Sequence, residues 1–248
     1  MCGRFAFYSP HEAVVRLFGV TDLALDVAPR WNIAPTTYVP AVRVLPDDPA
    51  TRRLAMLYWG LVPGWAKDRA IGAKLNNARS ETLREKPSFR NAYQRRRCLV
   101  LADGYYEWQR SGPAKQPYYV QLASSEPFAM AGLWEHWRDP ASGDALESCT
   151  LITTAPLPSI AFIHDRMPVI LPPEAYAEWL DPANRDVERL DRWLAPGEAL
   201  QLVARPVGRL VNNARNDGPG LIEPVALSAG GRETGPTEEP GPQQGSLL

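Results

Sequence analysis

Residues 97–134 read RCLVLADGYYEWQRSGPAKQPYYVQLASSEPFAMAGLW and indicate the fold more clearly than any other stretch. Runs rich in aromatic and aliphatic side chains occupy 98–102, 105–108, 118–123 and 128–134, with a turn expected at Ser111-Gly112-Pro113. Four strands within about forty residues are typical of a meander or a barrel-like sheet. The centre of the chain is therefore expected to be β structure.

On both sides of this stretch the pattern predicts further strands and short helices. Strands are expected at 38–45 and 51–61, joined as a hairpin across 46–49, and at 148–154 and 200–207. A first helix should begin with Ser9 as N-cap, Pro10 in its first turn and Glu12 completing a capping box, and end at Gly19. Further helices are expected at 80–86, 88–95, 173–180 and 186–194, and 30–35 is expected to be an irregular loop.

Composition places the chain among soluble globular proteins. Of 248 residues, 45% are hydrophobic and 22% charged, without an apolar run long enough to span a membrane or a signal pattern, so a cytoplasmic location is expected. Three cysteines and three histidines are scattered, which predicts neither a disulfide framework nor a metal site, and no other cofactor is expected. We expect one domain over 1–227 and a disordered Gly/Pro-rich tail over 228–248.

Charge is distributed unevenly along the chain. Residues 1–100 carry 16 Lys and Arg against 8 Asp and Glu, whereas residues 101–228 carry 10 against 17. The basic half includes the run Arg95-Arg96-Arg97 and suits a polyanion such as nucleic acid. From charge alone, a solvated basic helix face explains the same pattern.

Cys2 is the first candidate for chemistry. Removal of Met1 would leave one residue bearing both a free amine and a thiol. Such a 1,2-aminothiol forms an imine with an aldehyde and then closes its sulfur onto the imine carbon as a five-membered thiazolidine. Both groups are partly in their nucleophilic forms near neutral pH. An ordinary small residue in a frayed terminus is the alternative for Cys2, although the strand expected after it favours order.

Three other stretches carry groups that could serve this chemistry. Glu107 is flanked by aromatic residues on an expected strand, where burial would raise its pKa, although a solvent-facing glutamate fits the same periodicity. His164 lies between prolines with charged neighbours, and a structural histidine is its alternative. Asn77 offers an amide and Arg79 a guanidinium for a phosphate, or both belong to a plain loop and helix cap.

Together these stretches resemble the SRAP family, the SOS-response-associated peptidases or abasic-site processing proteins. The resemblance covers 2–226 and rests on seven motifs in the same order. They are Cys2-Gly3-Arg4-Phe5-Ala6, Trp31-Asn32-Ile33-Ala34-Pro35, Trp59-Gly60-Leu61-Val62-Pro63-Gly64-Trp65, Asn77-Ala78-Arg79-Ser80-Glu81-Thr82, Arg97-Cys98-Leu99, Asp103-Gly104-Tyr105-Tyr106-Glu107-Trp108 and His164-Asp165-Arg166-Met167-Pro168.

The resemblance implies an α+β fold with a curved, barrel-like, mostly antiparallel β core and peripheral short helices. It also implies binding of single-stranded DNA that contains abasic sites, and covalent capture of the lesion as a thiazolidine on Cys2. In this family pattern Asn77 holds the sugar and the terminal amine, Glu107 shuttles protons, and His164 assists opening of the sugar ring. The expected protein is a monomer without an obligate protein partner, cytoplasmic and associated with the nucleoid when bound to DNA.

The same resemblance assigns DNA contacts. Arg4 and Arg79 are expected to grip phosphates that flank the lesion, and Trp65 to stack on or wedge beside a base. Ala66 follows Trp65 where relatives often carry a second aromatic residue, which weakens the expected wedge but not the crosslinking chemistry.

Three other functions compete with lesion capture. Met-Cys-Gly also opens the class II glutamine amidotransferases, whose terminal cysteine attacks a glutamine amide. That reading leaves the ten basic residues between 65 and 97 without a purpose. A single-strand-binding module without catalysis is the second alternative. Peptidase activity on the protein's own N-terminal residue, which the family also attaches to Cys2, is the third.

Overall fold

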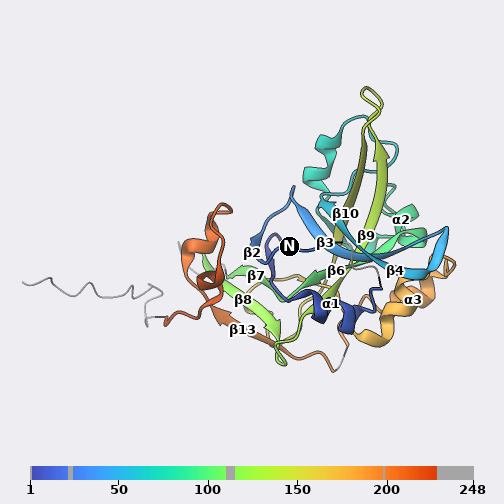
Figure 1. Cartoon of the computed structure of the whole chain (residues 1–248). Coiled ribbons are helices and arrows are strands. Elements are labelled where there is room, and N and C mark those ends of the chain that lie inside the picture. The colour runs from blue at the N-terminus through green and yellow to red at the C-terminus, as the bar shows by residue number, and fades with distance from the viewer. Residues whose placement is uncertain (1, 22–24, 110–114, 198, 228–248) are drawn as a thin grey trace, which may run out of the picture.

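The computed structural model describes residues 2–21, 25–109, 115–197 and 199–227 (Figure 1). The expected turn at 111–113 and the tail at 228–248 lie outside the described residues. The strands are β1 (Phe5–Phe7), β2 (Arg30–Ile33), β3 (Tyr38–Leu45), β4 (Asp48–Trp59), β5 (Asn77–Arg79), β6 (Arg97–Ala102), β7 (Gly104–Gln109), β8 (Gln116–Leu122), β9 (Phe128–Arg138), β10 (Ala145–Thr154), β11 (Met167–Pro168), β12 (Ile170–Leu171) and β13 (Leu202–Pro206).

Short helices lie between the strands. The α-helices are α1 (His11–Phe18), α2 (Arg90–Arg95), α3 (Tyr176–Leu180) and α4 (Val187–Asp191), and the 3₁₀ helices are η1 (Arg69–Lys74), η2 (Ser80–Thr82), η3 (Pro173–Ala175), η4 (Arg209–Asn212) and η5 (Pro219–Ile222). None of the helices in the described part of the chain is long and apolar enough to cross a membrane.

The centre of the fold is a closed barrel. Strand pairing runs β10-β4-β3-β6-β9 and returns from β9 to β10, so these five strands form a ring. Only the short contact between β10 and β4 is parallel within this ring. β5 joins β10 in parallel, and β11 and β12 extend the sheet at its margins. β6 is buried along its whole length, as an element inside a β core requires.

A second, antiparallel sheet has the order β13-β8-β7-β1-β2. Figure 1 shows it beside the barrel, away from the projecting β9–β10 hairpin. The chain passes from one sheet to the other at Asp103, between β6 and β7. The α+β, barrel-like fold is therefore confirmed. The four central strands do not form one meander, because β6 and β9 pair in the barrel while β7 and β8 pair in the second sheet.

Two local predictions near the N-terminus are wrong. Residues 30–33 form β2 instead of a loop, because they pair with β1 through Phe5 opposite Ile33. Ser9 does not cap α1, whose N-cap is Pro10 without a side-chain bond. The Ser9 hydroxyl donates to Asp103 Oδ1 at 2.5 Å, and that tertiary acceptor replaces the local cap. The predicted end at Gly19 is confirmed by its left-handed φ of 64°.

Helices predicted in the middle and late chain are shorter than expected. Segment 80–86 forms only the 3₁₀ turn η2, and α2 begins at Arg90 instead of 88. The predicted helix at 186–194 is reduced to α4. Helices this short gain little from backbone hydrogen bonding alone, so packing against the sheets sets their limits.

Candidate active site

Cys2 lies inside the protein rather than at a frayed end. Its side chain is 0% exposed and belongs to the main apolar core. Gly3 and Arg4 connect Cys2 to β1. The Arg4 carbonyl oxygen accepts a hydrogen bond from the backbone amide of Tyr106 in β7 at 2.9 Å. Burial raises the pKa of the Cys2 thiol, and the negative charge of Glu107 raises it further. The thiol is therefore held in its neutral form.

Asn77 holds Cys2 in place. It begins β5, which pairs with β10 through Leu151, and its Nδ2 donates to the Cys2 carbonyl oxygen at 2.7 Å. Its Oδ1 is buried and has no hydrogen-bond partner among the described residues. The side chain thus fixes the start of the chain with one end and presents an acceptor with the other.

Glu107 is a buried carboxyl group on β7, only 5% exposed. Burial raises its pKa to about 7, while a hydrogen bond from the Trp108 backbone acts to lower it. The expected rise in the pKa of Glu107 is therefore present, and burial is its main cause. A carboxyl group that titrates near neutral pH can both accept and return a proton at physiological pH.

His164 lies in the loop between β10 and β11, and its side chain is 14% exposed. Its Nδ1 is 3.0 Å from the Arg166 backbone amide and 2.9 Å from Asp165 Oδ1. The neutral ring accepts from the amide, whereas the protonated ring can donate to Asp165. The loop is secured by Arg166, whose guanidinium donates to Glu81 at 2.6 and 3.0 Å.

These contacts bring the four predicted catalytic residues together from distant parts of the sequence. Asn77 is bonded to Cys2, and Glu107 acts electrostatically on the Cys2 thiol. Glu107 and His164 line one small pocket. That pocket is closed by Tyr105, Val120, Ile160, Ile163 and Arg166. The arrangement places a carboxyl group and an imidazole around one space, and the same carboxyl group acts on the nearby thiol of Cys2.

Of the predicted DNA-contact residues, Arg4 is half-buried. Its Nη1 donates to Asn32 Oδ1 and to the Val211 carbonyl oxygen, both at 2.8 Å. Its Nη1 is therefore engaged within the protein, where it links the residue before β1 to β2 and to η4. Arg79 is exposed at the end of β5, two residues after Asn77.

Trp65 is 59% exposed and lines a separate surface pocket of Pro63, Gly64, Pro87, Ser88, Asn91, Arg96 and Glu135. Because its indole ring is exposed, Trp65 is available for stacking on a base. Ala66, by contrast, is buried in an apolar cluster with Trp137, whose indole donates to the Ala66 carbonyl oxygen at 2.7 Å. A larger side chain at 66 would require this cluster to rearrange.

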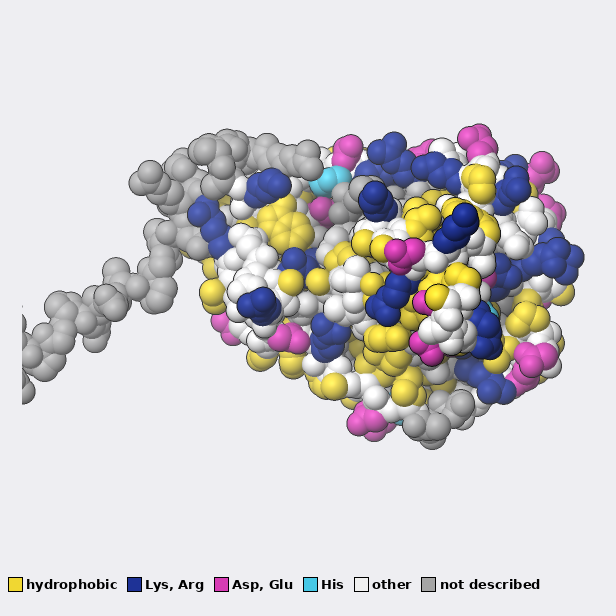
Figure 2. Space-filling view, turned by 90° about the horizontal axis from the view of Figure 1, so that it is seen from above, with side chains coloured by type: hydrophobic (Ala, Val, Ile, Leu, Met, Phe, Trp, Pro, Cys, Tyr) yellow, Lys and Arg dark blue, Asp and Glu magenta, His cyan; other side chains and the backbone are white. Residues whose placement is uncertain are grey.

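The basic run at 95–97 is only partly a surface feature. Arg95 is exposed, but Arg96 pairs with Glu135 at 2.6 Å. Arg97 is 3% exposed and donates to four backbone carbonyl oxygens, of Tyr93, Trp179, Asp181 and Asn184. Figure 2 shows Lys and Arg side chains at many separate points of one face, with acidic side chains between them. The surface available to a polyanion is thus smaller than the sequence count implies.

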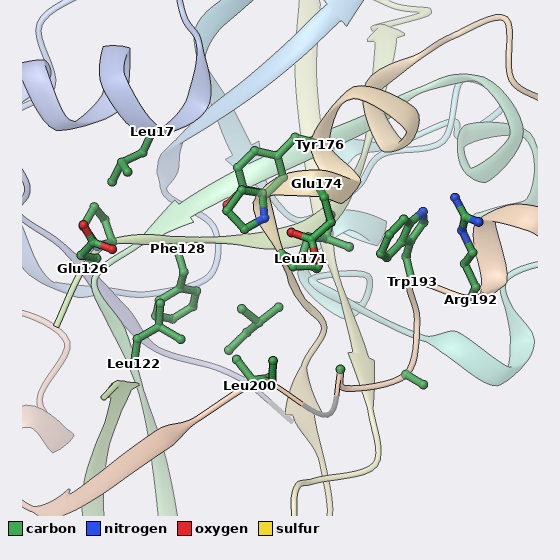
Figure 3. A pocket seen from close by; sticks show the side chains of 17 residues that line it. Leu17, Leu122, Glu126, Phe128, Leu171, Glu174, Tyr176, Arg192, Trp193 and Leu200 are labelled. Atoms are coloured by element: carbon green, nitrogen blue, oxygen red, sulfur yellow. The ribbon is translucent and has the colours of Figure 1, made fainter. Parts of the chain in front are cut away.

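A further pocket of about 540 Å³ lies away from these residues. Apolar side chains from α1, β8, β9, β12 and the η3–α3 segment face it, among them Leu17, Leu122, Phe128, Leu171 and Tyr176 (Figure 3). It contains none of the seven predicted site residues.

Comparison with known proteins shows the family to which this chain belongs. The family model for SOS response associated peptidase (SRAP) matches residues 1–214. The chain belongs to the SRAP family. Among its relatives, the abasic site processing protein YoqW of Bacillus subtilis is 43% identical over 226 residues, 90% of this chain and 99% of YoqW. YedK of Escherichia coli, also named an abasic site processing protein, is 33% identical over 91% of this chain and 100% of YedK.

The eukaryotic relative HMCES of Xenopus tropicalis, again named an abasic site processing protein, is 34% identical over 81% of this SRAP chain and 67% of HMCES. Solved structures share the fold. A protein from Bacteroides thetaiotaomicron superposes with a TM-score of 0.79 at 24% identity, covering 91% of this chain and all of that one. A Bordetella bronchiseptica protein superposes with a TM-score of 0.70 at 29% identity, covering 84% of this chain.

Sequence reasoning missed two residues that shape the site. Asp103 receives hydrogen bonds from the backbone amides of Tyr8 and Ser9 and so fixes the segment after β1. Glu81 anchors the His164 loop through Arg166. Both lie within motifs of the sequence that carry site residues, but periodicity does not indicate the partner of either side chain. Their roles depend on contacts across 85 to 95 residues of chain.

Proposed function

We propose that this SRAP protein captures abasic sites in single-stranded DNA by forming a thiazolidine on Cys2. One observation carries the proposal, the setting of Cys2. The residue is buried, its carbonyl oxygen accepts a hydrogen bond from Asn77, and the nearby carboxyl group of Glu107 has a pKa of about 7. An N-terminal cysteine without a chemical role could lie on the surface, so burial beside this carboxyl group favours a chemical role. The names of its relatives support abasic-site processing as the function.

The chemistry requires removal of Met1, which frees the amine of Cys2. That amine adds to the aldehyde carbon of the ring-opened deoxyribose and gives a carbinolamine, which loses water to form an imine. Glu107 takes a proton from the attacking amine and supplies one to the departing hydroxyl. The Cys2 sulfur then adds to the imine carbon, the C=N π bond breaks, and the thiol proton is transferred to the nitrogen.

The remaining residues bind and orient the substrate in this proposal. The free Oδ1 of Asn77 accepts from the amine or from a sugar hydroxyl. His164 transfers protons to the sugar oxygen as its ring opens. Exposed Arg79 contacts a flanking phosphate, half-buried Arg4 contributes its remaining donors, and Trp65 stacks on a neighbouring base.

The test uses the full chain after Met1 removal, confirmed by its mass, and a single-stranded oligonucleotide with one abasic site. We expect an adduct that survives denaturation, with a mass equal to the sum of the reactants less one water. Cys2→Ala should abolish it, and so should one alanine inserted ahead of Cys2, and thermal melting should show that both variants still fold.

Other outcomes would support the competing functions. Binding to the oligonucleotide without a denaturation-resistant adduct would indicate a single-strand-binding module. Release of ammonia from glutamine would indicate an amidotransferase and overturn the proposal. Self-cleavage after Met1 by the purified chain, lost in Cys2→Ala, would establish the peptidase activity as a second property of the same residue.

A further inference from the structure

Trp59 contacts both of the segments that meet at Cys2. The residue ends β4 and is 0% exposed. Its ring makes an edge-on contact with Phe5 of β1, with the ring centroids 5.1 Å apart and an interplanar angle of 60°. Its indole Nε1 donates to the Asn76 carbonyl oxygen at 2.8 Å. Because Phe5 follows Cys2 by three residues and Asn76 directly precedes Asn77, one buried side chain contacts the chain beside both partners of the Asn77–Cys2 hydrogen bond.

The backbone of Trp59 is itself fixed. Its amide donates to the Thr37 carbonyl oxygen at 2.9 Å, and its carbonyl oxygen accepts from the Thr36 amide at 2.8 Å. Directly after it, the Gly60 amide donates to the Cys149 carbonyl oxygen of β10 at 2.9 Å. The indole therefore extends from a backbone that is hydrogen-bonded at this residue and the next, and it can hold the groups that it contacts.

The strand that carries the active-site amide is short. β5 consists of three residues, Asn77–Arg79, and so has few ladder hydrogen bonds of its own. It lies against β10, where the Leu151 amide donates to the Asn76 carbonyl oxygen at 3.1 Å. This bond and the Trp59 indole thus reach the same oxygen from two elements. The first fixes β5 relative to β10, whereas the second relates β5, through the ring contact with Phe5, to β1 and the start of the chain.

We propose that Trp59 is a positioning residue for lesion capture, which holds Asn77 where its amide can bond to Cys2. This inference rests on the proposed function and leaves its covalent steps unchanged. The bonded carbonyl group and the reacting amine belong to the same residue, so a shift of β5 against β1 turns the amine away from the aldehyde carbon. Misplacing a reacting group by about 1 Å can slow a reaction by about 100-fold. Trp59 is buried, so it acts through these contacts and not by touching DNA.

The test compares Trp59→Phe with the parent protein on single-stranded DNA that contains one abasic site. Phenylalanine keeps an aromatic ring at this position and removes the indole N–H. Adduct formation is followed over a range of DNA concentrations, which separates the maximal rate from the concentration that gives half of it. We expect the maximal rate to fall about tenfold or more while the half-saturating concentration stays within about twofold, because binding of the DNA backbone does not depend on where the amine stands.

Trp179→Phe is the matched control. Trp179 is also 0% exposed, and its indole also donates to a backbone carbonyl oxygen, that of Cys98, at 3.0 Å. Both variants should lose a similar amount of melting temperature, but Trp179→Phe should keep the maximal rate of the parent. An unchanged rate in Trp59→Phe would overturn the inference, as would an equal slowing in both variants.

Asn77→Ala shows whether Trp59 acts through the active-site amide. Cys2 remains in this variant, so a slower reaction with the aldehyde persists. Adding Trp59→Phe to Asn77→Ala should then slow the reaction no further, whereas effects that multiply would overturn the inference. Should Trp59→Phe not fold, Phe5→Leu, which removes the same ring contact from the side of β1, takes its place in both comparisons. If the parent itself forms no adduct, the proposed function fails instead.

Discussion

Glu107 shows at the scale of one residue how a cost in stability becomes a chemical property. Burial holds its pKa at about 7, well above that of an exposed glutamate. The folded protein therefore binds this proton more tightly than the unfolded chain does. The contribution of Glu107 to stability is therefore largest below the unfolded pKa of about 4.3 and falls as pH rises through the window up to the folded value.

Glu107→Gln should separate chemistry from folding. The amide cannot shuttle a proton, so adduct formation should slow by about 100-fold or more, the scale of general acid–base catalysis. It also removes the buried carboxylate, so the free energy of unfolding at pH 8 should rise by roughly 1–3 kcal/mol. The parent rate should change with pH around 7, and the variant should lose this inflection. Equal losses of adduct rate and DNA affinity would instead assign Glu107 a structural role.

At the scale of elements, the site is assembled by joining two segments whose regular elements are only two or three residues long. β5 and η2 carry Asn77 and Glu81, and the loop before β11 carries His164 and Arg166. The ion pair between Glu81 and Arg166 connects them. The hydrogen bond from Arg166 lowers the pKa of Glu81, so the pair contributes fully above the unfolded glutamate pKa and is lost as pH falls through the lower folded value.

Glu81→Gln should therefore loosen the His164 loop and slow adduct formation severalfold. Because Glu81 is largely exposed, the change in global stability should stay below about 1 kcal/mol. Glu85→Gln is the control, since it removes an exposed carboxylate four residues later. Thermal melting and adduct kinetics of both variants give the comparison. If Glu85→Gln slows the reaction as much as Glu81→Gln, general charge and not the ion pair is responsible.

The whole molecule divides its basic residues between the surface and the interior. Arg79 is exposed beside the site, whereas Arg97 is buried against carbonyl oxygens from α2, α3 and the segment after α3. A count of formal charges treats these two arginines as equal. Only the surface one can exchange counterions with a DNA backbone.

We expect Arg79→Ala to weaken DNA binding without loss of stability, and Arg97→Ala to destabilise the fold. Arg79→Ala should leave the melting temperature unchanged, weaken binding to single-stranded DNA and reduce the slope of log affinity against log salt by about one. Arg97→Ala leaves several buried carbonyl groups unpaired and should destabilise the fold by about 3 kcal/mol or more. Fluorescence anisotropy across a salt series, with thermal denaturation, measures both. A salt slope unchanged in Arg79→Ala would remove Arg79 from the DNA contacts.

The sequence by itself determined the β-rich centre, the end of α1 at Gly19 and the candidate residues of the site, because strand periodicity, turn residues and short motifs are local properties. Tertiary structure decided how those elements pair. It divided β6 to β9 between two sheets, made a strand of Arg30–Ile33 and took Ser9 from the helix cap to Asp103. It also buried Arg97 and left the Tyr105 hydroxyl without a hydrogen-bond partner among the described residues. Each of these outcomes depends on a contact between segments distant in the chain, and neither periodicity nor charge reports which distant group a side chain will meet.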